Sequence, residues 1–456
     1  MPSNNQDTAL IILAAGHGTR MQSRLPKVLH EIGHLPMLGH VLKTGAGLSP
    51  ERVAVVIGAQ ALEVGEAAKG LAPENSPPPQ IFIQDPPRGT GDAVRVAMDS
   101  IQGFSGAVFV LYADTPLLPV RVLERMRETL AMGHGVVVLG FRPAEPGAYG
   151  RLVTDKDGGL QRIVEAKDAS PDELAIALCN SGVMAFDADI LRRHLPKISN
   201  DNAKGEYYLT DMVALARAAQ ISCAIVEAGE DDVLGVNSRV ELAEAEAIFQ
   251  SRARHRAMLD GATLRDPAST YFSHDTHLGR DVVVGPGVIF GPGVQVGDGV
   301  EIKAFSHLEG AHVAAGASIG PYARLRPGAK IGEQAKIGNF VEVKKADIAK
   351  GAKISHLSYI GDAVVGAEAN IGAGTITCNY DGYDKHITII GAGAFIGSNT
   401  ALVAPITIGD GAYVGSGSVV VKNVSEDALV LTRAEQVEKP DWAKRYRAAK
   451  QQRKNK

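Results

Sequence analysis

The stretch VGPGVIFGPGVQVGDGVEI, residues 284–302, has an apolar residue at every sixth position, usually followed by glycine. The pattern continues to about Val421, with one-residue slips and one irregular segment at Thr377–Thr388. A period of six fits neither an α-helix nor the two-residue alternation of a single strand. It fits a parallel β-helix with three short strands per coil, in which glycines take tight, often positive-φ turns. The positions expected inside the coils are Val284, Phe290, Val296, Ile302, Leu308, Val313, Ile319, Leu325, Ile331, Ile337, Val343, Ile348, Ile354, Ile360, Val365, Ile371, Ile390, Ile396, Leu402, Ile408, Val414 and Val420.

The first half of the chain has a different pattern, in which apolar runs alternate with helix-like segments. This alternation predicts an α/β domain with a largely parallel sheet. Ser238–Met258 contains no Gly or Pro and predicts one long linking helix. We therefore expect domains at 1–239 and 261–456 with a linker at 240–260. The expected strands are Ala9–Ala14, Val53–Ile57, Ile81–Ile83, Ala107–Leu111 and Val136–Leu139, and the expected helices are Pro36–Gly45, Gln60–Lys69, Thr90–Asp99 and Pro119–Met132.

Bulk properties restrict the class of partner. The chain has 456 residues and a formal net charge of −4, which argues against nucleic acid or an anionic membrane as the main partner. Three widely spaced cysteines suit a reducing compartment, and no run approaches the ~20 apolar residues of a membrane span. The N-terminus does not resemble a secretory leader. We expect a soluble cytoplasmic protein with small-molecule substrates. The basic tail after Asp441 has no pattern and is expected to be a solvated end.

A glycine-rich turn directly follows the first expected strand. Gly16 and Gly18 allow the backbone to bend around phosphate oxygens, and the basic Arg20 and Lys27 come soon after. The turn is neither a dinucleotide fingerprint, because Met21 occupies the third glycine position, nor a Walker loop. Asp114 follows another apolar strand and is a candidate Mg²⁺ ligand. Its alternative role is a helix N-cap or turn residue.

The breaks in the repeat carry the candidate residues of the second half. His356 interrupts the coil, and acetyl transfer to an amine needs a base that titrates near neutral pH. The alternative is a histidine satisfied by neighbouring turns. Arg326 and Lys344 stand where glycine is expected and are candidates for binding a sugar phosphate. Ordinary solvated cations are the alternative for both.

The motifs LAAGHGTRM at residues 13–21 and PKVLH at residues 26–30 resemble the signature of sugar nucleotidyltransferases. Together with the six-residue repeat, they make the chain similar to the bacterial bifunctional UDP-N-acetylglucosamine pyrophosphorylase/glucosamine-1-phosphate N-acetyltransferases. The resemblance extends from about Leu10 to Arg433. It implies a Rossmann-like nucleotidyltransferase domain, a linking helix and a left-handed β-helix. The repeat motifs that match are RLRPGA at 324–329, NFVEVKK at 339–345, HLSY at 356–359, NIGAGTITCNYDG at 370–382 and FIGS at 395–398.

For the first domain, the resemblance implies attack of N-acetylglucosamine-1-phosphate on the α-phosphorus of UTP, with Mg²⁺ held by Asp114 and Asn237. Arg20 and Lys27 would balance the phosphate charge. Two positions depart from the commonest family pattern: Ala113 replaces glycine and Asp92 replaces histidine. A methyl group at Ala113 is expected to crowd the ligand slightly. The nucleotide-sugar site implied by the resemblance consists of Leu13, Ala14, Ala15, Gly16, Lys27, Gln84, Gly89, Thr90, Tyr112, Ala113, Asp114, Gly150, Glu165, Asn180 and Asn237.

For the second domain, the resemblance implies that His356 is the general base for acetylation of glucosamine-1-phosphate by acetyl-CoA. The product of the two reactions would supply peptidoglycan and lipopolysaccharide synthesis. Flat prism faces bury little alone, so we also expect a homotrimer with sites between subunits. Ser416 stands at a position of the acetyl-CoA site where the family often has alanine. The implied sugar-phosphate site is Arg326, Lys344, Tyr359, Asn370 and Lys385, and the implied acetyl-CoA site is Ala373, Asn379, Tyr380, Ser398, Ser416 and Arg433.

Three other functions are compatible with parts of the sequence. The first is a nucleotidyltransferase with a purely structural or regulatory β-helix. The second is a metal-dependent β-helix hydratase, similar to the gamma carbonic anhydrases, using the closely spaced His307 and His312. The third is a sugar-nucleotide-binding scaffold without activity, against which the intact Lys27, Asp114 and His356 argue.

Overall fold

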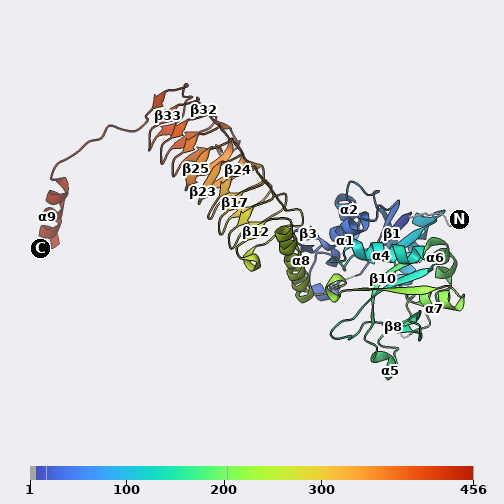
Figure 1. Ribbon diagram of the computed structural model, residues 1–456. Helices are drawn as coiled ribbons and strands as arrows, with labels where there is room; N and C mark the ends of the chain where they lie inside the picture. Colours follow the sequence, from blue (N-terminus) through green and yellow to red (C-terminus); the bar gives the residue numbers. More distant parts are fainter. Residues whose placement is uncertain (1–6, 17, 203, 455–456) are drawn as a thin grey trace. The chain divides into compact units, whose positions relative to one another are not determined.

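The computed structural model describes residues 7–16, 18–202 and 204–454 and divides the chain into two compact units, Met1–Ala253 and Arg254–Lys456. Figure 1 shows the secondary structure of both units. The division falls inside helix α8 (Arg239–Leu259), the segment that the sequence predicts as the linking helix.

The N-terminal unit is built on one twisted sheet of nine strands. Seven of them follow the spatial order β11–β7–β10–β6–β1–β4–β5, and only β10 runs antiparallel to its neighbours on this path. The strands are β1 (Thr8–Ala14), β4 (Arg52–Gly58), β5 (Gln80–Gln84), β6 (Ala107–Tyr112), β7 (Val136–Phe141), β10 (Cys179–Asp187) and β11 (Cys223–Ala228), with β8 (Arg151–Thr154) and β9 (Leu160–Val164) pairing beside β10 and β2 (Glu31–Ile32) with β3 (Leu35–Pro36) forming a separate hairpin.

Helices cover both faces of this sheet. They are α1 (Met37–Ala46), α2 (Leu62–Leu71), α3 (Thr90–Val96), α4 (Val120–Ala131), α5 (Pro171–Leu174), α6 (Ala188–His194) and α7 (Asp211–Ala218). Short 3₁₀ turns are η1 (Thr19–Met21), η2 (Lys27–Leu29), η3 (Met98–Ile101), η4 (Leu195–Lys197), η5 (Glu230–Asp232) and η6 (Pro267–Ser269). The expected helix Thr90–Asp99 is thus shorter, because the chain tightens into η3 after Val96.

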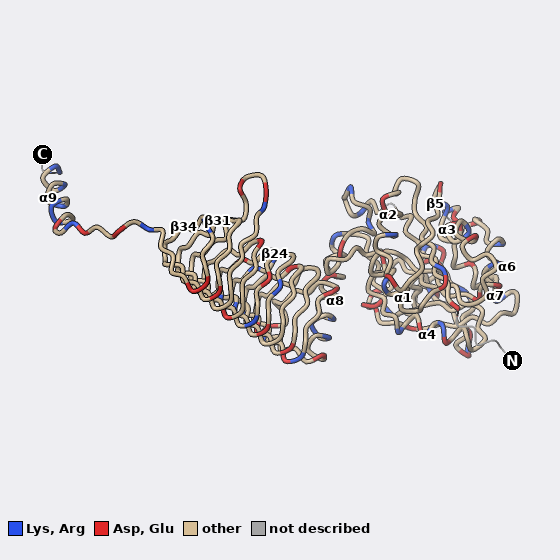
Figure 2. The backbone as a smooth tube through the Cα atoms, turned by 90° about the horizontal axis from the view of Figure 1, so that it is seen from above, with Lys and Arg blue, Asp and Glu red and all other residues tan. Residues whose placement is uncertain are grey.

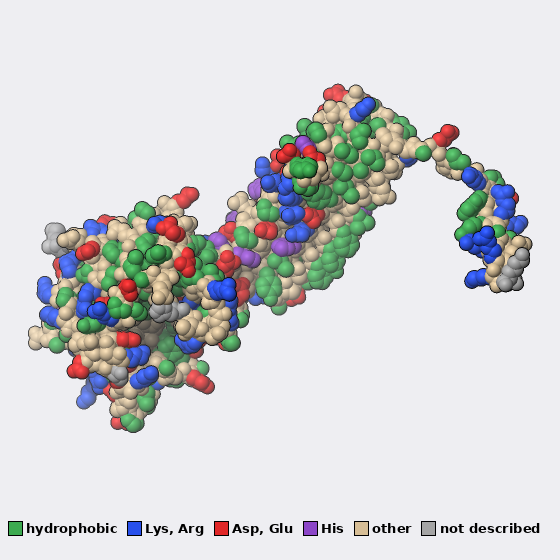
Figure 3. All heavy atoms as spheres, turned by 180° about the vertical axis from the view of Figure 1, so that it is seen from behind, with side chains coloured by type: hydrophobic (Ala, Val, Ile, Leu, Met, Phe, Trp, Pro, Cys, Tyr) green, Lys and Arg blue, Asp and Glu red, His purple; other side chains and the backbone are tan. Residues whose placement is uncertain are grey.

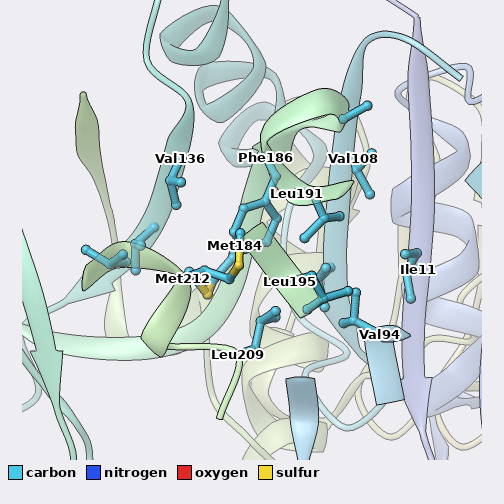
Figure 4. Close-up of a cluster of buried hydrophobic side chains, with 14 of the residues drawn as sticks. Ile11, Val94, Val108, Val136, Met184, Phe186, Leu191, Leu195, Leu209 and Met212 are labelled. Atoms are coloured by element: carbon cyan, nitrogen blue, oxygen red, sulfur yellow. The ribbon is translucent and has the colours of Figure 1, made fainter. Parts of the chain in front are cut away.

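Strand β1 is buried on both sides, as a central parallel strand must be. Its side chains alternate between two hydrophobic clusters. Ile11 packs with Val94 of α3 and Leu191 of α6 on one face, and Figure 4 shows this cluster. Leu10 packs with Leu42 of α1 on the other face, together with α2 and α4. The sheet is therefore the middle layer of three, and its strand ends remain open for a site.

The C-terminal unit is a parallel β-helix whose strands pair coil on coil. One face contains β12 (Thr263–Leu264), β14 (Val283–Val284), β17 (Glu301–Ile302), β20 (Ser318–Ile319), β23 (Lys336–Asn339), β25 (Lys353–His356), β27 (Asn370–Ile371), β30 (Phe395–Ile396), β33 (Tyr413–Val414) and β35 (Leu429–Val430). The remaining strands are β13 (His277–Leu278), β15 (Ile289–Phe290), β16 (Gln295–Val296), β18 (His307–Leu308), β19 (Ala311–Val313), β21 (Arg324–Leu325), β22 (Ala329–Ile331), β24 (Glu342–Ile348), β26 (Tyr359–Val365), β28 (Ile376–Cys378), β29 (Thr388–Ile390), β31 (Ala401–Val403), β32 (Ile406–Ile408) and β34 (Val419–Val420).

The strand register reproduces the sequence repeat. Val284 pairs with Ile302 in the next coil, and Ile302 pairs with Ile319, so that coil is one residue shorter where the sequence slips. Ile371 pairs with Ile396, because the irregular segment is accommodated as a loop outside the ladder. Every position that the repeat predicts to be interior is buried. The interior is therefore continuous through the irregular segment.

The role expected for the repeat glycines is largely wrong. Among the glycines directly after an interior residue in the described coils, only Gly320 has a positive φ, 87°. At most of the others it is close approach that excludes a side chain: a Cβ on Gly285 would lie 2.7 Å from Ala304 N, and one on Gly397 would lie 2.4 Å from Ser416 N. Positive φ occurs two residues later, as at Gly287.

The basic tail is helical rather than irregular. Helix α9 (Trp442–Lys454) consists mainly of strong helix formers, and Trp442 stacks on Tyr446 one turn later, with ring centroids 5.0 Å apart. Every residue from Leu431 to Lys454 is exposed. Among the described residues, no helix is both long and apolar enough to cross a membrane.

Candidate active sites

A cavity of about 420 Å³ opens at the carboxyl ends of β1, β5 and β6. β1 lies between β4 and β6, and the chain changes direction across the sheet here, so the cavity is at the topological switch point where α/β sheets bind ligands. Ten predicted residues line it: Leu13, Ala14, Ala15, Gly16, Lys27, Gln84, Gly89, Thr90, Tyr112 and Asp114. Val28, Pro87, Ala93 and Glu206 also line it and were not assigned from the sequence.

Lys27 joins the two predicted metal ligands. Its ammonium makes a short hydrogen-bonded ion pair with Asp114 and donates a hydrogen bond of 3.0 Å to Asn237 Oδ1. The loop that carries Asn237 is tied in place, because the Val236 N–H donates to the Asp114 carbonyl at 2.8 Å and Glu241 accepts the Asn237 N–H at 2.7 Å. One carboxylate oxygen and one amide oxygen thus converge on a single cationic atom, which is a donor set that a hard cation such as Mg²⁺ fits.

The glycines of the first turn serve different purposes. Gly18 has a φ of 59°, and a Cβ there would lie 2.5 Å from Lys27 Cβ, so this glycine lets the turn pack on Lys27. At Gly16 a Cβ would meet no protein atom within 4 Å. Because Gly16 lines the cavity, a side chain there would enter the space available to a ligand.

Asp92, one of the departures from the family pattern, supports Gln84. The Gln84 side-chain amide donates to Asp92 Oδ2 at 2.9 Å and to the Gly89 carbonyl at 3.0 Å. These two contacts fix the orientation of the Gln84 side-chain amide at the cavity. Thr90 Oγ1 accepts the Leu209 N–H at 3.1 Å and joins this rim to the following segment.

The predicted sugar-binding residues form a second group around Tyr112. The Asn180 N–H donates to the Gly150 carbonyl at 2.8 Å, and a Cβ on Gly150 would lie 3.6 Å from Glu165 Oε1. Burial raises the pKa of Glu165, with Lys204 opposing the shift. Burial also raises the pKa of Tyr112, whose hydroxyl contacts Thr90, and the negative charge of Glu165 adds to this shift. A carboxyl held in such surroundings is suited to hydrogen-bonding neutral sugar hydroxyl or amide groups.

Six predicted residues lie outside the set that lines the cavity: Gly150, Glu165, Asn180 and Asn237, described above, and Arg20 and Ala113. Arg20 lies in η1 and is exposed, outside the set that lines the cavity. Ala113 is fully buried in the cluster with Leu10 and Ile12, and its N–H donates to the Leu13 carbonyl at 3.0 Å. Its methyl group therefore packs in the core and does not crowd the cavity, contrary to our expectation.

His356 ends strand β25, and its ring is exposed. Its Nδ1 lies 2.6 Å from Oδ1 of Asn339, which is the residue beside it in the preceding coil. An amide oxygen can only accept, so in the neutral imidazole Nδ1 carries the proton and Nε2 keeps its lone pair. Asn339 was missed as a functional residue, although it could have been found by stepping back one coil from His356.

The basic residues at the breaks form a cluster on successive coils. Leu325 pairs with Val343 and Val343 with Ile360, which places Arg326 and Lys344 one above the other. Arg326 is neutralised by Glu342 at 2.8 Å. Lys344 instead faces Lys385, close enough for a side-chain hydrogen bond. The side-chain contact with Lys385 and then the charge of Lys385 lower the pKa of Lys344, desolvation and the charge of Arg326 add to the shift, and Asp362 opposes it. Figure 3 shows basic side chains gathered on this part of the coils.

Tyr359 lies beside the cluster of basic residues. Its hydroxyl oxygen would be 2.3 Å from a Cβ on Gly361. Gly361 pairs with Lys344 in the neighbouring coil. Asn370 pairs with Lys353 on the face that carries His356. The five predicted sugar-phosphate residues thus fall on neighbouring coils.

Four predicted acetyl-CoA residues form a column at one corner. The Asn399 N–H donates to the Ala373 carbonyl at 2.7 Å, the Gly417 N–H to the Ser398 carbonyl at 2.8 Å, and Arg433 to the Ser416 carbonyl at 2.7 Å. Asn379 is outside this column: its buried side-chain amide donates to Asp362. Tyr380 is exposed at the base of the adjacent loop.

Comparison with known proteins also separates an N-terminal transferase part of the chain from a C-terminal hexapeptide-repeat part. The MobA-like NTP transferase domain family matches residues 10–179, and the bacterial transferase hexapeptide family (six repeats) matches residues 275–310 and 387–422. The bifunctional protein GlmU of Maricaulis maris is 56% identical over 99% of this chain and 98% of its own. The GlmU proteins of Dinoroseobacter shibae (55% identical, 96% of each chain) and Rhodospirillum rubrum (56%, 97% of each chain) are similarly close. The chain belongs to the GlmU family.

As a GlmU protein the chain is a bifunctional transferase, an acetyltransferase and uridylyltransferase of UDP-N-acetylglucosamine synthesis. The predicted fold class is confirmed, including the left-handed hexapeptide-repeat β-helix. The hydratase alternative has no support: His307 and His312 pair in register with the cations Arg324 and Lys330. No cluster of three or more His, Cys, Asp or Glu suited to a metal occurs in the described part of the chain.

Proposed function

We propose that the two units catalyse consecutive steps on one aminosugar phosphate. The β-helix transfers the acetyl group of acetyl-CoA to glucosamine-1-phosphate. The N-terminal unit then transfers UMP from UTP to N-acetylglucosamine-1-phosphate and releases pyrophosphate. Sites are assigned to these substrates by their charge, burial and hydrogen-bonding groups.

In acetyl transfer, Nε2 of His356 takes a proton from the 2-ammonium group of the sugar. The free amine attacks the thioester carbonyl carbon, the carbon–sulfur bond breaks, and the coenzyme leaves as a thiolate that takes up the proton lost by the attacking nitrogen. Asn339 keeps Nδ1 protonated and Nε2 available. Arg326, Lys344 and Lys385 bind the phosphate, with Tyr359 and Asn370 beside the sugar, and the column with Ala373, Ser398, Ser416 and Arg433 binds the coenzyme together with Asn379 and Tyr380.

In uridylyl transfer, an oxygen of the sugar phosphate attacks the α-phosphorus of UTP, and the bond to the β-phosphate breaks. The turn at Leu13–Gly16, Gln84, Gly89 and Thr90 holds the nucleotide, while Gly150, Glu165 and Asn180 hold the sugar. Asp114 and Asn237 would hold Mg²⁺, which when bound supplies charge neutralisation on the phosphates. Lys27 must then release both oxygens and turn toward the phosphates, and Arg20 balances charge from the rim.

We also propose that the protein forms a homotrimer. Phe305, Tyr322 and Phe340 stack on successive coils with centroids 5.0 and 5.2 Å apart, and each is about half exposed. Figure 3 shows hydrophobic side chains continuing along an edge of the β-helix. A contiguous apolar stripe of this kind differs from single exposed apolar residues scattered over a surface. It is suited to burial against other copies of the chain. The three cysteines are free, which suits a reducing cytoplasm.

The observation that carries the proposal is the contact between His356 and Asn339, because it gives an exposed imidazole a defined unprotonated nitrogen. We expect His356→Ala to lower acetyl transfer by about 10²–10⁴-fold and to leave uridylyl transfer unchanged. The measurement is a coupled assay from glucosamine-1-phosphate to UDP-N-acetylglucosamine, with acetyl-CoA or UTP omitted in turn. His312→Ala is the matched control, since His312 is exposed on the same β-helix and has no assigned role. Equal losses in the two variants would refute the assignment.

A further inference from the structure

The loop between β28 and β29 contains a carboxylate with no role in the account above. This loop leaves the coil after Cys378 and returns at Thr388, and Figure 2 shows it rising from the coils. Lys385, on its returning side, is the residue that faces Lys344. Asp381 stands at the start of the loop tip.

Asp381 closes the loop through both carboxylate oxygens. Oδ1 accepts the N–H groups of Tyr383 at 2.8 Å and Asp384 at 2.7 Å. Oδ2 lies 2.8 Å from Nε2 of His386, directly after Lys385. These contacts, led by the Asp384 N–H, hold the pKa of Asp381 well below its usual range. The carboxylate therefore ties the tip of the loop to its returning side.

Backbone contacts hold the loop at its base and, more weakly, at its tip. The His386 N–H donates to the Asn379 carbonyl at 2.8 Å, Tyr380 and Lys385 form an isolated antiparallel bridge, and the Asp381 N–H donates to the Asp384 carbonyl at 3.2 Å. The Asp381 carboxylate adds three contacts to these, and the one to His386 joins the tip to the segment bearing Lys385. Without these three contacts, the exposed loop would sample more conformations.

The arrangement of Lys385 explains why such a tie is useful. Two ammonium groups held side by side repel each other, so a mobile loop would carry Lys385 away from Lys344 before the anion arrives. If both cations are already held in place, the free energy needed to order the loop is not subtracted from the free energy of binding the anion. We propose that Asp381, acting with His386, is a positioning residue that keeps Lys385 against Lys344 to receive the phosphate of the sugar substrate. This inference rests on the proposed acetyl-transfer site.

The test uses the full-length protein and follows the KM for glucosamine-1-phosphate. We expect Asp381→Ala to raise this KM by about tenfold, the effect of ~1.4 kcal/mol of lost preorganisation. The kcat should change by less than about twofold, because His356 is untouched. Uridylyl transfer should be unchanged. Asp384→Ala is the matched control: it removes the same charge from the same loop and retains the contacts of the Asp381 carboxylate.

A double variant tests whether Asp381 acts through Lys385. If it does, Asp381→Ala combined with Lys385→Ala should have the KM of Lys385→Ala alone. Effects that multiply, or an Asp381→Ala variant with an unchanged KM, would overturn the proposal. If Asp381→Ala fails to fold, His386→Ala removes the Oδ2 contact alone and should raise the same KM in the same direction.

The failure of this inference is distinguishable from failure of the underlying site. If Lys344→Ala and Lys385→Ala leave the KM for glucosamine-1-phosphate unchanged, the phosphate assignment itself is wrong and the positioning role falls with it. If those variants raise the KM and Asp381→Ala does not, only the positioning role is wrong. Limited trypsin digestion gives an independent readout, since Asp381→Ala should accelerate cleavage after Lys385, and glucosamine-1-phosphate should slow it.

Discussion

Lys27 in the N-terminal unit and Lys344 in the β-helix both lie in candidate phosphate sites, but their surroundings are opposite. Lys27 is 9% exposed, and its ammonium is already matched by Asp114 and Asn237. Lys344 faces a second ammonium, that of Lys385, and the nearby Arg326 is occupied by Glu342. Lys27 therefore has an anionic partner, while among the described residues Lys344 forms no ion pair.

This difference indicates what each site must receive. On the proposed assignment, a metal held by Asp114 and Asn237 would replace the Lys27 ammonium, so the N-terminal site would exchange one cation for another. The β-helix site has positive charge in excess and gains directly from an arriving anion. On the same assignment, the proposed need for metal at one site and not at the other would accompany this difference in internal ion pairing.

The largest expected effect is that of metal removal. With EDTA in excess, uridylyl transfer should fall by at least ~10³-fold, because charge neutralisation on the triphosphate contributes several kcal/mol to the transition state. Acetyl transfer should stay within about twofold, because lysines and an arginine neutralise the sugar phosphate. The two rates are measured separately in the same preparation, and added Mg²⁺ should restore the first. Loss of both rates together would break the comparison.

The interior of the β-helix could be predicted from sequence because it is periodic. Val284 and Ile371 lie in different coils, yet the same six-residue spacing assigns both to the interior, and both are buried. The function of the repeat glycines could not be predicted in this way. The neighbour that excludes a side chain at Gly285 is Ala304 in the next coil, and an argument from local φ does not include it.

Site residues were predictable where a local motif carries them and not where distant segments meet. The turn at Leu13–Gly16 and the position of Asp114 follow from strand ends, which share one edge of a parallel sheet. The support of Gln84 by Asp92 depends on a side-chain contact that no motif encodes. The contact between Lys27 and Asn237 joins residues from opposite ends of the unit. Tertiary structure alone brings these groups together.

The second prediction concerns Lys344. Lys344→Met should raise the KM for glucosamine-1-phosphate by about 10–100-fold, because a charge-assisted contact with the phosphate is lost. Since Lys385 lowers the pKa of Lys344, wild-type binding should weaken as pH rises, beginning at a lower pH than for an ordinary lysine. Lys385→Met should move that weakening to higher pH. Lys330→Met is the control, because Lys330 is exposed on the same β-helix and lies opposite Asp347. A pH profile that Lys385→Met leaves unmoved would contradict the paired-cation site.

The smallest expected effect is on stability, and its sign differs between the two lysines. Lys27→Met leaves the partly buried Asp114 carboxylate without a cation, which should lower the free energy of unfolding of the N-terminal unit by about 1–3 kcal/mol. Lys344→Met removes repulsion between like charges and should leave stability unchanged or slightly higher. Thermal unfolding of the full-length variants checks both, with the transition of the N-terminal unit identified as the one that UTP shifts.

Divalent metal provides the control for this contrast. In Lys27→Met the two oxygens of Asp114 and Asn237 no longer have a competitor, so Mg²⁺ without nucleotide should recover part of the lost stability. In the wild-type protein the same addition should have less effect, because Lys27 must first be displaced. Equal stabilisation of wild type and Lys27→Met would mean that Lys27 does not compete for these oxygens. The opposite charge environments would then not determine which site needs a metal.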